Sequence, residues 1–137
     1  MKKVIIRKTE EIENWRSNIT SDINFIPTMG NLHNGHSKLI STAKNDNSNI
    51  NLVSIFVNPL QFDKKSDLEN YPKTIDHDIK ISFENGADAI FIPSTEEIYP
   101  PNNKNIKFLK APKELSSTLC GLNRIGHFDG VWTGVYR

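Results

Sequence analysis

The stretch INFIPTMGNLHNGHSKLISTAK, residues 23–44, has the order of a strand, a glycine-containing loop and a helix. Ile23 to Ile26 is rich in residues that favour strands, and Pro27 is expected to end that strand. From about Gly35 to Lys44 the spacing of apolar residues predicts an amphipathic helix. The residues expected to face inward from this helix are Leu39, Ile40 and Ala43.

The segments on both sides continue the alternation of strand and helix. Strands are predicted at Val4 to Ile6, at the almost entirely apolar Asn51 to Val57, and at Asp88 to Ile92. Helices are predicted from Thr9 to Asn18, with Thr9 as cap, and from Thr74 to Asn85, followed by Gly86 as the residue beyond its end. In the second helix, inward positions four residues apart are Ile75, Ile79 and Phe83.

Strands that alternate with helices over this length predict an α/β fold with a doubly wound parallel sheet and right-handed crossovers. The rest is less regular, with a further strand expected at Ile106 to Leu109 and a short helix at Pro112 to Leu119. We expect residues 1–137 to form one domain, because no repeat or low-complexity linker divides them.

Composition limits the function classes. The net charge is +1 with both signs interspersed, so no nucleic acid or anionic membrane surface is expected as a partner. The start of the chain has too few apolar residues for a signal peptide, and no stretch reaches the ~20 needed to span a membrane. One cysteine, Cys120, allows no internal disulfide. We therefore expect a soluble, cytoplasmic protein.

The loop Thr28 to His36 is the first candidate site, because ligands of open parallel sheets lie beyond the carboxyl ends of the strands. Gly30 and Gly35 permit close approach of the backbone to a ligand, and the start of the following helix suits a phosphate. His33 and His36 are three residues apart and would share one side of the first helical turn. A capped helix start with surface histidines, or half of a metal site, are the alternatives.

Two further loops contain polar groups in matching places. Asn58 and Gln61 follow the strand in SIFVNPLQF, residues 54–62, where loop capping is the structural alternative to ligand binding. Arg124 lies in LCGLNRIGHFDGV, residues 119–131, where it is either a carboxylate or phosphate partner or a surface residue. Asp76 and Asp78 are interpreted as solvated carboxylates of a helix face rather than Mg²⁺ ligands, and no protein ligand to a metal is assigned.

Together these motifs resemble a known family. The chain has P-T-M-G and H-x-G-H, then S-I-F-V-N-P-x-Q-F with D and Y-P beyond it, and then a segment that resembles L-x-G-x-x-R-P-G-H-F-x-G-V. In this order the motifs are similar to the N-terminal part of the pantothenate synthetases. These enzymes belong to the nucleotidyltransferase superfamily with the H-x-G-H motif, so the resemblance implies a Rossmann-like fold. It covers roughly residues 25–137, and it differs at Ile125, Lys73 and His77.

The resemblance implies an ATP-dependent ligase that condenses pantoate with β-alanine through pantoyl adenylate, releasing AMP and pyrophosphate. It implies Mg²⁺ with the ATP, His36 as the catalytic imidazole, and Gln61 at the pantoate and β-alanine site, with Asn58 and Arg124 as further candidates. A homodimer is compatible with it. The ATP-binding residues that it implies are Met29, Gly30, Asn31, Leu32, His33, Asn34, Gly35 and His36.

Two other functions stay open at this point. One is an adenylyltransferase of the same superfamily with a phosphate acceptor, and the other is a nucleotide-binding module without catalysis. The family has further ATP-binding and pantoate-binding segments, a G-E-K-D-like stretch and a K-M-S-like loop, which residues 1–137 do not contain. We therefore expect a domain that lacks the C-terminal region of the family.

Overall fold

A computed structural model describes residues 2–45 and 48–101 of the chain. The described residues belong to two compact units. Of the described residues, the first contains those up to Phe56 together with Pro72–Glu97, and the second contains Val57–Tyr71 and residues 98–101. The sheet and its covering helices lie in the first unit.

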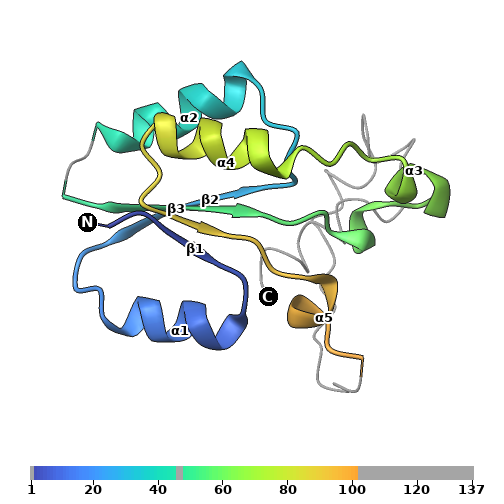
Figure 1. Cartoon of the computed structure of the whole chain (residues 1–137), viewed down its shortest axis with the longest axis horizontal. Coiled ribbons are helices and arrows are strands. Elements are labelled where there is room, and N and C mark those ends of the chain that lie inside the picture. The colour runs from blue at the N-terminus through green and yellow to red at the C-terminus, as the bar shows by residue number, and fades with distance from the viewer. Residues whose placement is uncertain (1, 46–47, 102–137) are drawn as a thin grey trace, which may run out of the picture. The chain divides into compact units, whose positions relative to one another are not determined.

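The described sheet is parallel throughout (Figure 1). Its strands lie side by side in the order β1-β4-β3-β2. The strands are β1 (Val4–Ile6), β2 (Ile23–Thr28), β3 (Ile50–Ile55) and β4 (Ala89–Phe91). The helices of the first unit that cover the sheet are α1 (Thr9–Ser17), α2 (Asn34–Lys44) and α4 (Ile75–Glu84).

The helices cover both faces of the sheet. Figure 1 shows α1 on one face and α2 with α4 on the other. The chain crosses the sheet in one direction from β1 to β2 and returns in the other direction through β3 to β4. Right-handed crossovers place the helices of these two directions on opposite faces. The predicted doubly wound α/β fold is therefore confirmed.

The core lies between the sheet and the face covered by α2 and α4. Ile40, Val53 and Ile90 are fully buried there, and Ile75, Ile79 and Phe83 of α4 pack against this cluster as their spacing predicts. Every residue of β3 after Ile50 is buried, as expected for a central parallel strand. At about 25 cal/mol per Å² of buried apolar area, each fully buried isoleucine or valine side chain contributes about 1.5–3 kcal/mol to the stability of the fold.

Leu39 was predicted to face inward, and this is wrong, because its side chain is 54% exposed. Neighbouring residues of a helix point in directions about 100° apart. Because Ile40 points at the sheet, Leu39 points away from it. Ala43, three residues further along α2, packs against the core on the same side. Of the two adjacent apolar residues Leu39 and Ile40, only Ile40 therefore belongs to the core.

The prediction that β2 ends at Pro27 is also wrong, because the strand continues to Thr28. The carbonyl of Thr28 accepts a hydrogen bond from the Phe56 N–H at 3.0 Å, so Thr28 faces β3. Successive residues of a strand alternate in direction, which puts the nitrogen of Pro27 on the outer side of β2. Since β2 is an edge of the described sheet, the missing N–H of proline interrupts no ladder bond there.

Other boundaries differ from the predictions by one or two residues. Thr9 is the first residue of α1 rather than its cap, a position that Lys8 occupies. β3 ends at Ile55 rather than Val57, and β4 is shorter at both ends than Asp88 to Ile92. The predicted strand at residues 106–109 and helix at 112–119 lie outside the described residues.

The second unit contains the short helices η1 (Pro59–Gln61) and α3 (Lys65–Glu69). The rings of Phe62 and Tyr71 meet edge to face, with their centroids 5.7 Å apart. A further short helix, α5 (Thr95–Ile98), follows β4.

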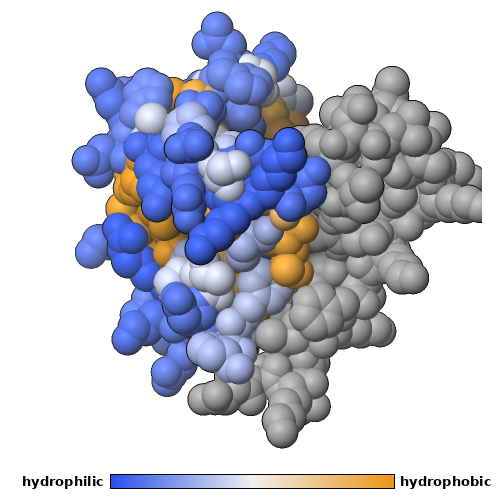
Figure 2. Space-filling model, turned by 90° about the vertical axis from the view of Figure 1, so that its right-hand side faces the viewer, coloured by the Kyte–Doolittle hydropathy of each residue, from blue (hydrophilic) through white to orange (hydrophobic). Residues whose placement is uncertain are grey.

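The surface of the described residues is mainly polar. Figure 2 shows hydrophilic residues over most of the described part of one face, with small separate hydrophobic areas. The large hydrophobic side chains that are exposed in the described ranges are Ile5, Phe25 and Leu39. Within those ranges, none of the helices has the length and apolar character to cross a membrane.

Candidate active site

The first part of the site is a tight turn directly after β2. The Thr28 hydroxyl donates to the Ser54 carbonyl at 2.8 Å and accepts from the Gly30 N–H at 3.2 Å. Gly30 and Asn31 then both adopt left-handed backbone conformations, with φ of 77° and 52°. Glycine reaches this region without strain, and asparagine is among the few other residues that enter it readily. This pair of residues turns the chain from the strand toward α2.

Asp78 of α4 holds this turn in place. Its side chain is fully buried, and its two oxygens accept hydrogen bonds from the Asn31 N–H at 3.0 Å and the Leu32 N–H at 2.9 Å. The Thr74 hydroxyl lies 3.1 Å from each of the same oxygens. The prediction of a solvated Asp78 is therefore wrong, whereas Asp76 is exposed as expected. Asp78 can be buried because two amides of the loop, 46 and 47 residues earlier in the chain, donate hydrogen bonds to its carboxylate.

His33 and His36 form a capping box at the start of α2, with His33 at the N-cap position. The Nδ1 atom of His33 accepts from the Gly35 N–H at 2.9 Å, and the Nδ1 atom of His36 accepts from the His33 N–H at 3.2 Å. The ring centroids are 4.2 Å apart. An Nδ1 atom that accepts carries no proton, so each neutral ring has its N–H at Nε2. The histidines therefore cap the helix and still supply two hydrogen-bond donors.

The environment of His36 favours its neutral form. Burial lowers the pKa of His36 below 6.5, and the charge of protonated His33 lowers it further, while the Asp78 carboxylate opposes both by raising it. Protonation at Nδ1 would also set a donor against the His33 N–H. At neutral pH His36 is therefore an uncharged donor at Nε2.

Several backbone N–H groups of the loop already have partners, either in the loop itself or in α4. The N–H of Gly30 binds Thr28, those of Asn31 and Leu32 bind Asp78, and those of His33 and Gly35 bind the two imidazoles. The structure thus brings the predicted residues Met29 to His36 together, but these five amides already have partners. The donors that remain for a ligand include the imidazole Nε2–H groups.

In the second unit, Asn58 is buried and its Oδ1 atom accepts from the Leu60 N–H at 3.1 Å and the Tyr99 hydroxyl at 3.0 Å. It therefore caps η1, which was the structural alternative for this residue. Gln61 is half-buried at the end of η1. Arg124 and the rest of its loop lie outside the described residues.

The side chains of Thr74 and Tyr99 were not identified from the sequence as members of these networks, and the burial of Asp78 was not predicted. The spacing of Thr74 and Asp78 contains a signal, because a threonine before a helix and an aspartate four residues later can meet on one side of the first turn. Tyr99 reaches Asn58 from 41 residues away in sequence. No local pattern could have indicated that contact.

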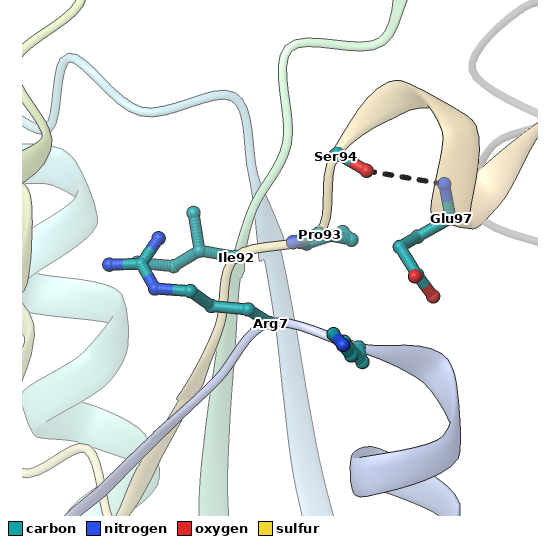
Figure 3. Close-up of a pocket in the computed structure, with 6 residues that line it drawn as sticks. Arg7, Ile92, Pro93, Ser94 and Glu97 are labelled. Atoms are coloured by element: carbon teal, nitrogen blue, oxygen red, sulfur yellow. Dashed lines mark hydrogen bonds between the residues drawn. The ribbon is translucent and has the colours of Figure 1, made fainter.

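A pocket of about 350 Å³ lies elsewhere in the first unit, between the ends of β1 and β4. Its lining residues are Arg7, Lys8, Ile92, Pro93, Ser94 and Glu97. Figure 3 shows the guanidinium of Arg7 extended away from Glu97. The Glu97 carboxylate accepts from the N–H and the hydroxyl of Thr9, both at 2.9 Å, which lowers the pKa of Glu97 below 4.5. The Glu97 carboxylate thus lies at the N-terminus of α1, where a negative charge is favourable.

No cluster of three or more histidine, cysteine, aspartate or glutamate side chains suited to a metal ion occurs among residues 2–45 and 48–101. The oxygens of Asp78 are directed to the loop and Thr74.

Comparison with known proteins gives a consistent result. A family model described as pantoate-beta-alanine ligase matches residues 4–137. Over the whole chain, 88% of residues are identical to the bifunctional pantoate ligase/cytidylate kinase of Prochlorococcus marinus strain MIT 9301, and 46% to that of strain NATL1A. The chain spans 27% of the length of each of these two relatives.

Solved structures also match. The pantoate-beta-alanine ligase of Francisella tularensis, complexed with beta-gamma ATP and beta-alanine, is 37% identical with a TM-score of 0.88, and the match covers 98% of this chain and 51% of that one. Pantothenate synthetase of Thermus thermophilus is 34% identical with a TM-score of 0.82, over 100% of this chain and 47% of that one.

Proposed function

The chain belongs to the pantoate-beta-alanine ligase family, and from this premise we propose that it provides the ATP site of an enzyme that makes pantothenate. In the first step an oxygen of the pantoate carboxylate attacks the α-phosphorus of ATP, and pyrophosphate leaves. In the second step the amine of β-alanine attacks the acyl carbon of pantoyl adenylate, loses a proton and displaces AMP.

One observation carries the proposal: the Nδ1 atoms of both imidazoles at the start of α2 accept backbone N–H groups, so that the Nε2 atoms remain as oriented donors. As pyrophosphate leaves, negative charge grows on its oxygens, and donors that are already oriented stabilise that charge without reorganising. The positive end of the α2 dipole acts in the same direction. We assign the main catalytic role to His36 and assign phosphate binding to His33 beside it.

Other residues of the proposed site follow from the family. Met29 to Gly35 border the ATP, although the amides of Asn31 and Leu32 are directed to Asp78 and so serve to shape the loop. Gln61 is proposed to contact pantoate and to border the β-alanine site, because an amide both donates and accepts without adding charge. Asn58 and Arg124 are proposed as further contributors to this site.

Mg²⁺ is proposed to arrive with ATP, held chiefly by phosphate oxygens and water. No step is assigned to the ion. We also propose that residues 1–137 act as one nucleotide-binding domain, in a cytoplasmic enzyme that can form a homodimer. The support for a reducing compartment is the single cysteine in the sequence.

The proposal is tested by exchange of labelled pyrophosphate into ATP, with and without pantoate, together with calorimetric measurement of ATP binding. The variants are His36→Ala and Gln61→Ala. The control is His77→Ala, which removes an exposed histidine of α4 outside the proposed site. Exchange that requires pantoate, survives in His77→Ala and is lost in the other two variants would support adenylate formation.

Other outcomes separate the alternatives. Exchange that depends on a phosphate acceptor instead of pantoate would favour an adenylyltransferase. ATP binding that His36→Ala weakens, without any exchange, would make this chain a nucleotide-binding module. A chain that does not bind ATP would contradict the proposal.

A further inference from the structure

Asp78 is a carboxylate whose surroundings lie in two distant parts of the chain. It belongs to the first turns of α4, and its oxygens accept from the Asn31 and Leu32 amides of the loop that precedes α2. The side chain is fully buried, so the loop and Thr74 replace the water that would otherwise solvate its charge. The carboxylate and the turn are therefore bound to each other.

The fit of the turn around Asp78 is close. A Cβ atom placed on Gly30 would lie 2.9 Å from the Oδ2 atom of Asp78. Gly30 and Asn31 both have positive φ, which Asn31 adopts less readily than a glycine, so the hydrogen bond from its N–H to Asp78 helps to hold it there. Hydrogen bonds to an ionised acceptor are shorter and stronger than those between neutral groups, which suits a carboxylate for this task.

We propose that Asp78 is a positioning residue of the ATP site, whose carboxylate fixes the Gly30–Leu32 turn and thereby the place where His33 and His36 begin α2. The proposal rests on the proposed function for its ATP site, but the hold of Asp78 on the turn is a property of this chain alone. Asp78 does not itself contact ATP in this proposal, because its oxygens are directed to the turn and to Thr74.

The negative charge of Asp78 has two opposite effects on the proposed ATP site. A carboxylate near a triphosphate repels it, whereas a carboxylate that accepts from two amides and a hydroxyl has its charge spread over these donors. Asp78 also raises the pKa of His36, against the effect of burial. The same group thus holds the turn and partly offsets the effect of burial on the pKa of His36.

The test replaces the charge and keeps the size. In Asp78→Asn one oxygen becomes an NH₂ group, which would face a backbone N–H that needs an acceptor. The matched control is Asp76→Asn, two residues earlier on the same helix, where the side chain is exposed. Both variants lose the same charge from α4, so general electrostatics is held constant.

Three quantities are measured on the whole chain: hydrogen exchange of the Asn31 and Leu32 amides, the pKa of His36 by NMR, and the dissociation constant of MgATP. In Asp78→Asn we expect faster exchange at both amides, a lower His36 pKa, and MgATP binding weaker by roughly 10- to 100-fold. We expect Asp76→Asn to change the dissociation constant by less than about twofold. Unchanged exchange of the β3 amides verifies that the fold is retained.

The proposal is overturned if a folded Asp78→Asn keeps slow amide exchange and MgATP affinity within about twofold, or if Asp76→Asn has the same effect. Should Asp78→Asn fail to fold, Thr74→Val carries the test, since it removes one donor to the carboxylate and keeps the charge. Thr74→Val should then also speed amide exchange, and its failure to do so would count against the proposal. If the unaltered chain does not bind MgATP, the proposed function fails, while the exchange and pKa results still decide whether Asp78 holds the turn.

Discussion

Replacement of Gly30 by alanine should be among the most damaging single-methyl changes in this chain. The new Cβ atom would lie 2.9 Å from Asp78 Oδ2 and 3.2 Å from Ile55 Cγ2. Both neighbours are buried, and Asp78 is held from the other side by the Asn31 and Leu32 amides and by Thr74. Neither neighbour can therefore move away without loss of another contact.

The magnitude follows from two contributions. A residue with a Cβ atom in the left-handed region costs about 1–2 kcal/mol more than glycine. Displacement of the Asp78 carboxylate far enough to weaken one of its hydrogen bonds costs about 1.5–3 kcal/mol. We therefore expect Gly30→Ala to lower the free energy of unfolding by about 2.5–5 kcal/mol, which is a large part of the usual stability of a domain.

Urea unfolding of the chain, followed by tryptophan fluorescence, measures this loss. Gly35→Ala is the matched control in the same loop, because Gly35 lies in α2 and its added Cβ atom would meet only the imidazole of His33, at 2.7 Å. There the gain in helix propensity, up to about 1 kcal/mol, offsets the weakened cap, about 1 kcal/mol, so little change is expected. If Gly30→Ala costs no more than Gly35→Ala, the turn is not held rigidly by Asp78, and the reasoning is refuted.

Three other outcomes are expected. Ile40→Ala should cost about 2–5 kcal/mol in urea unfolding, whereas Leu39→Ala should cost less than about 0.5 kcal/mol, because only Ile40 is buried. Glu97→Gln should remove a part of the acid sensitivity of folding: the pKa of Glu97 is lowered, so its carboxylate stabilises the fold above pH 4.5 and this contribution is lost as the pH falls through the lowered value. Unfolding curves over that acid range, for the unaltered chain and the variant, check this. The pKa of His36, measured by NMR titration, should lie below 6.5, so its neutral form favours folding fully above pH 6.5 and progressively less as the pH falls through the lowered value; a measured pKa above 6.5 would contradict this.

The sequence indicated most of the sheet and its helices because their signals are local. The apolar run of β3 and the spacing of Ile75, Ile79 and Phe83 in α4 predict the burial that the structure shows. The predicted end at Pro27 failed because the position of β2 in the sheet decides whether a proline is tolerated. That position depends on strand order, which the residues around Pro27 do not encode.

The sequence indicated which loop forms the candidate site, but not the hydrogen bonds that join this loop to distant parts of the chain. The glycines and histidines after β2 identified the loop, because their chemistry is visible in one short stretch. Asp78 was interpreted as solvated because a carboxylate early in a helix is usually exposed, and only the amides of Asn31 and Leu32 make its burial favourable. In the same way, Thr9 was interpreted as a local cap, whereas it binds Glu97 from 88 residues further along the chain.

The way in which this loop satisfies its own backbone limits how it can bind a phosphate. A glycine-rich loop commonly offers its amides to the anion, but here the amides of Asn31 and Leu32 cannot donate to a phosphate without giving up their buried contact with Asp78. We therefore expect the imidazole Nε2–H groups to be the main donors to a phosphate, and imidazoles respond to pH whereas amides do not. His36 keeps its cap only while Nδ1 is unprotonated, so acid should weaken the helix start and the donor geometry together. Binding of MgATP that is unchanged between about pH 8 and pH 5, apart from protonation of the nucleotide itself, would show that amides rather than imidazoles hold the phosphates.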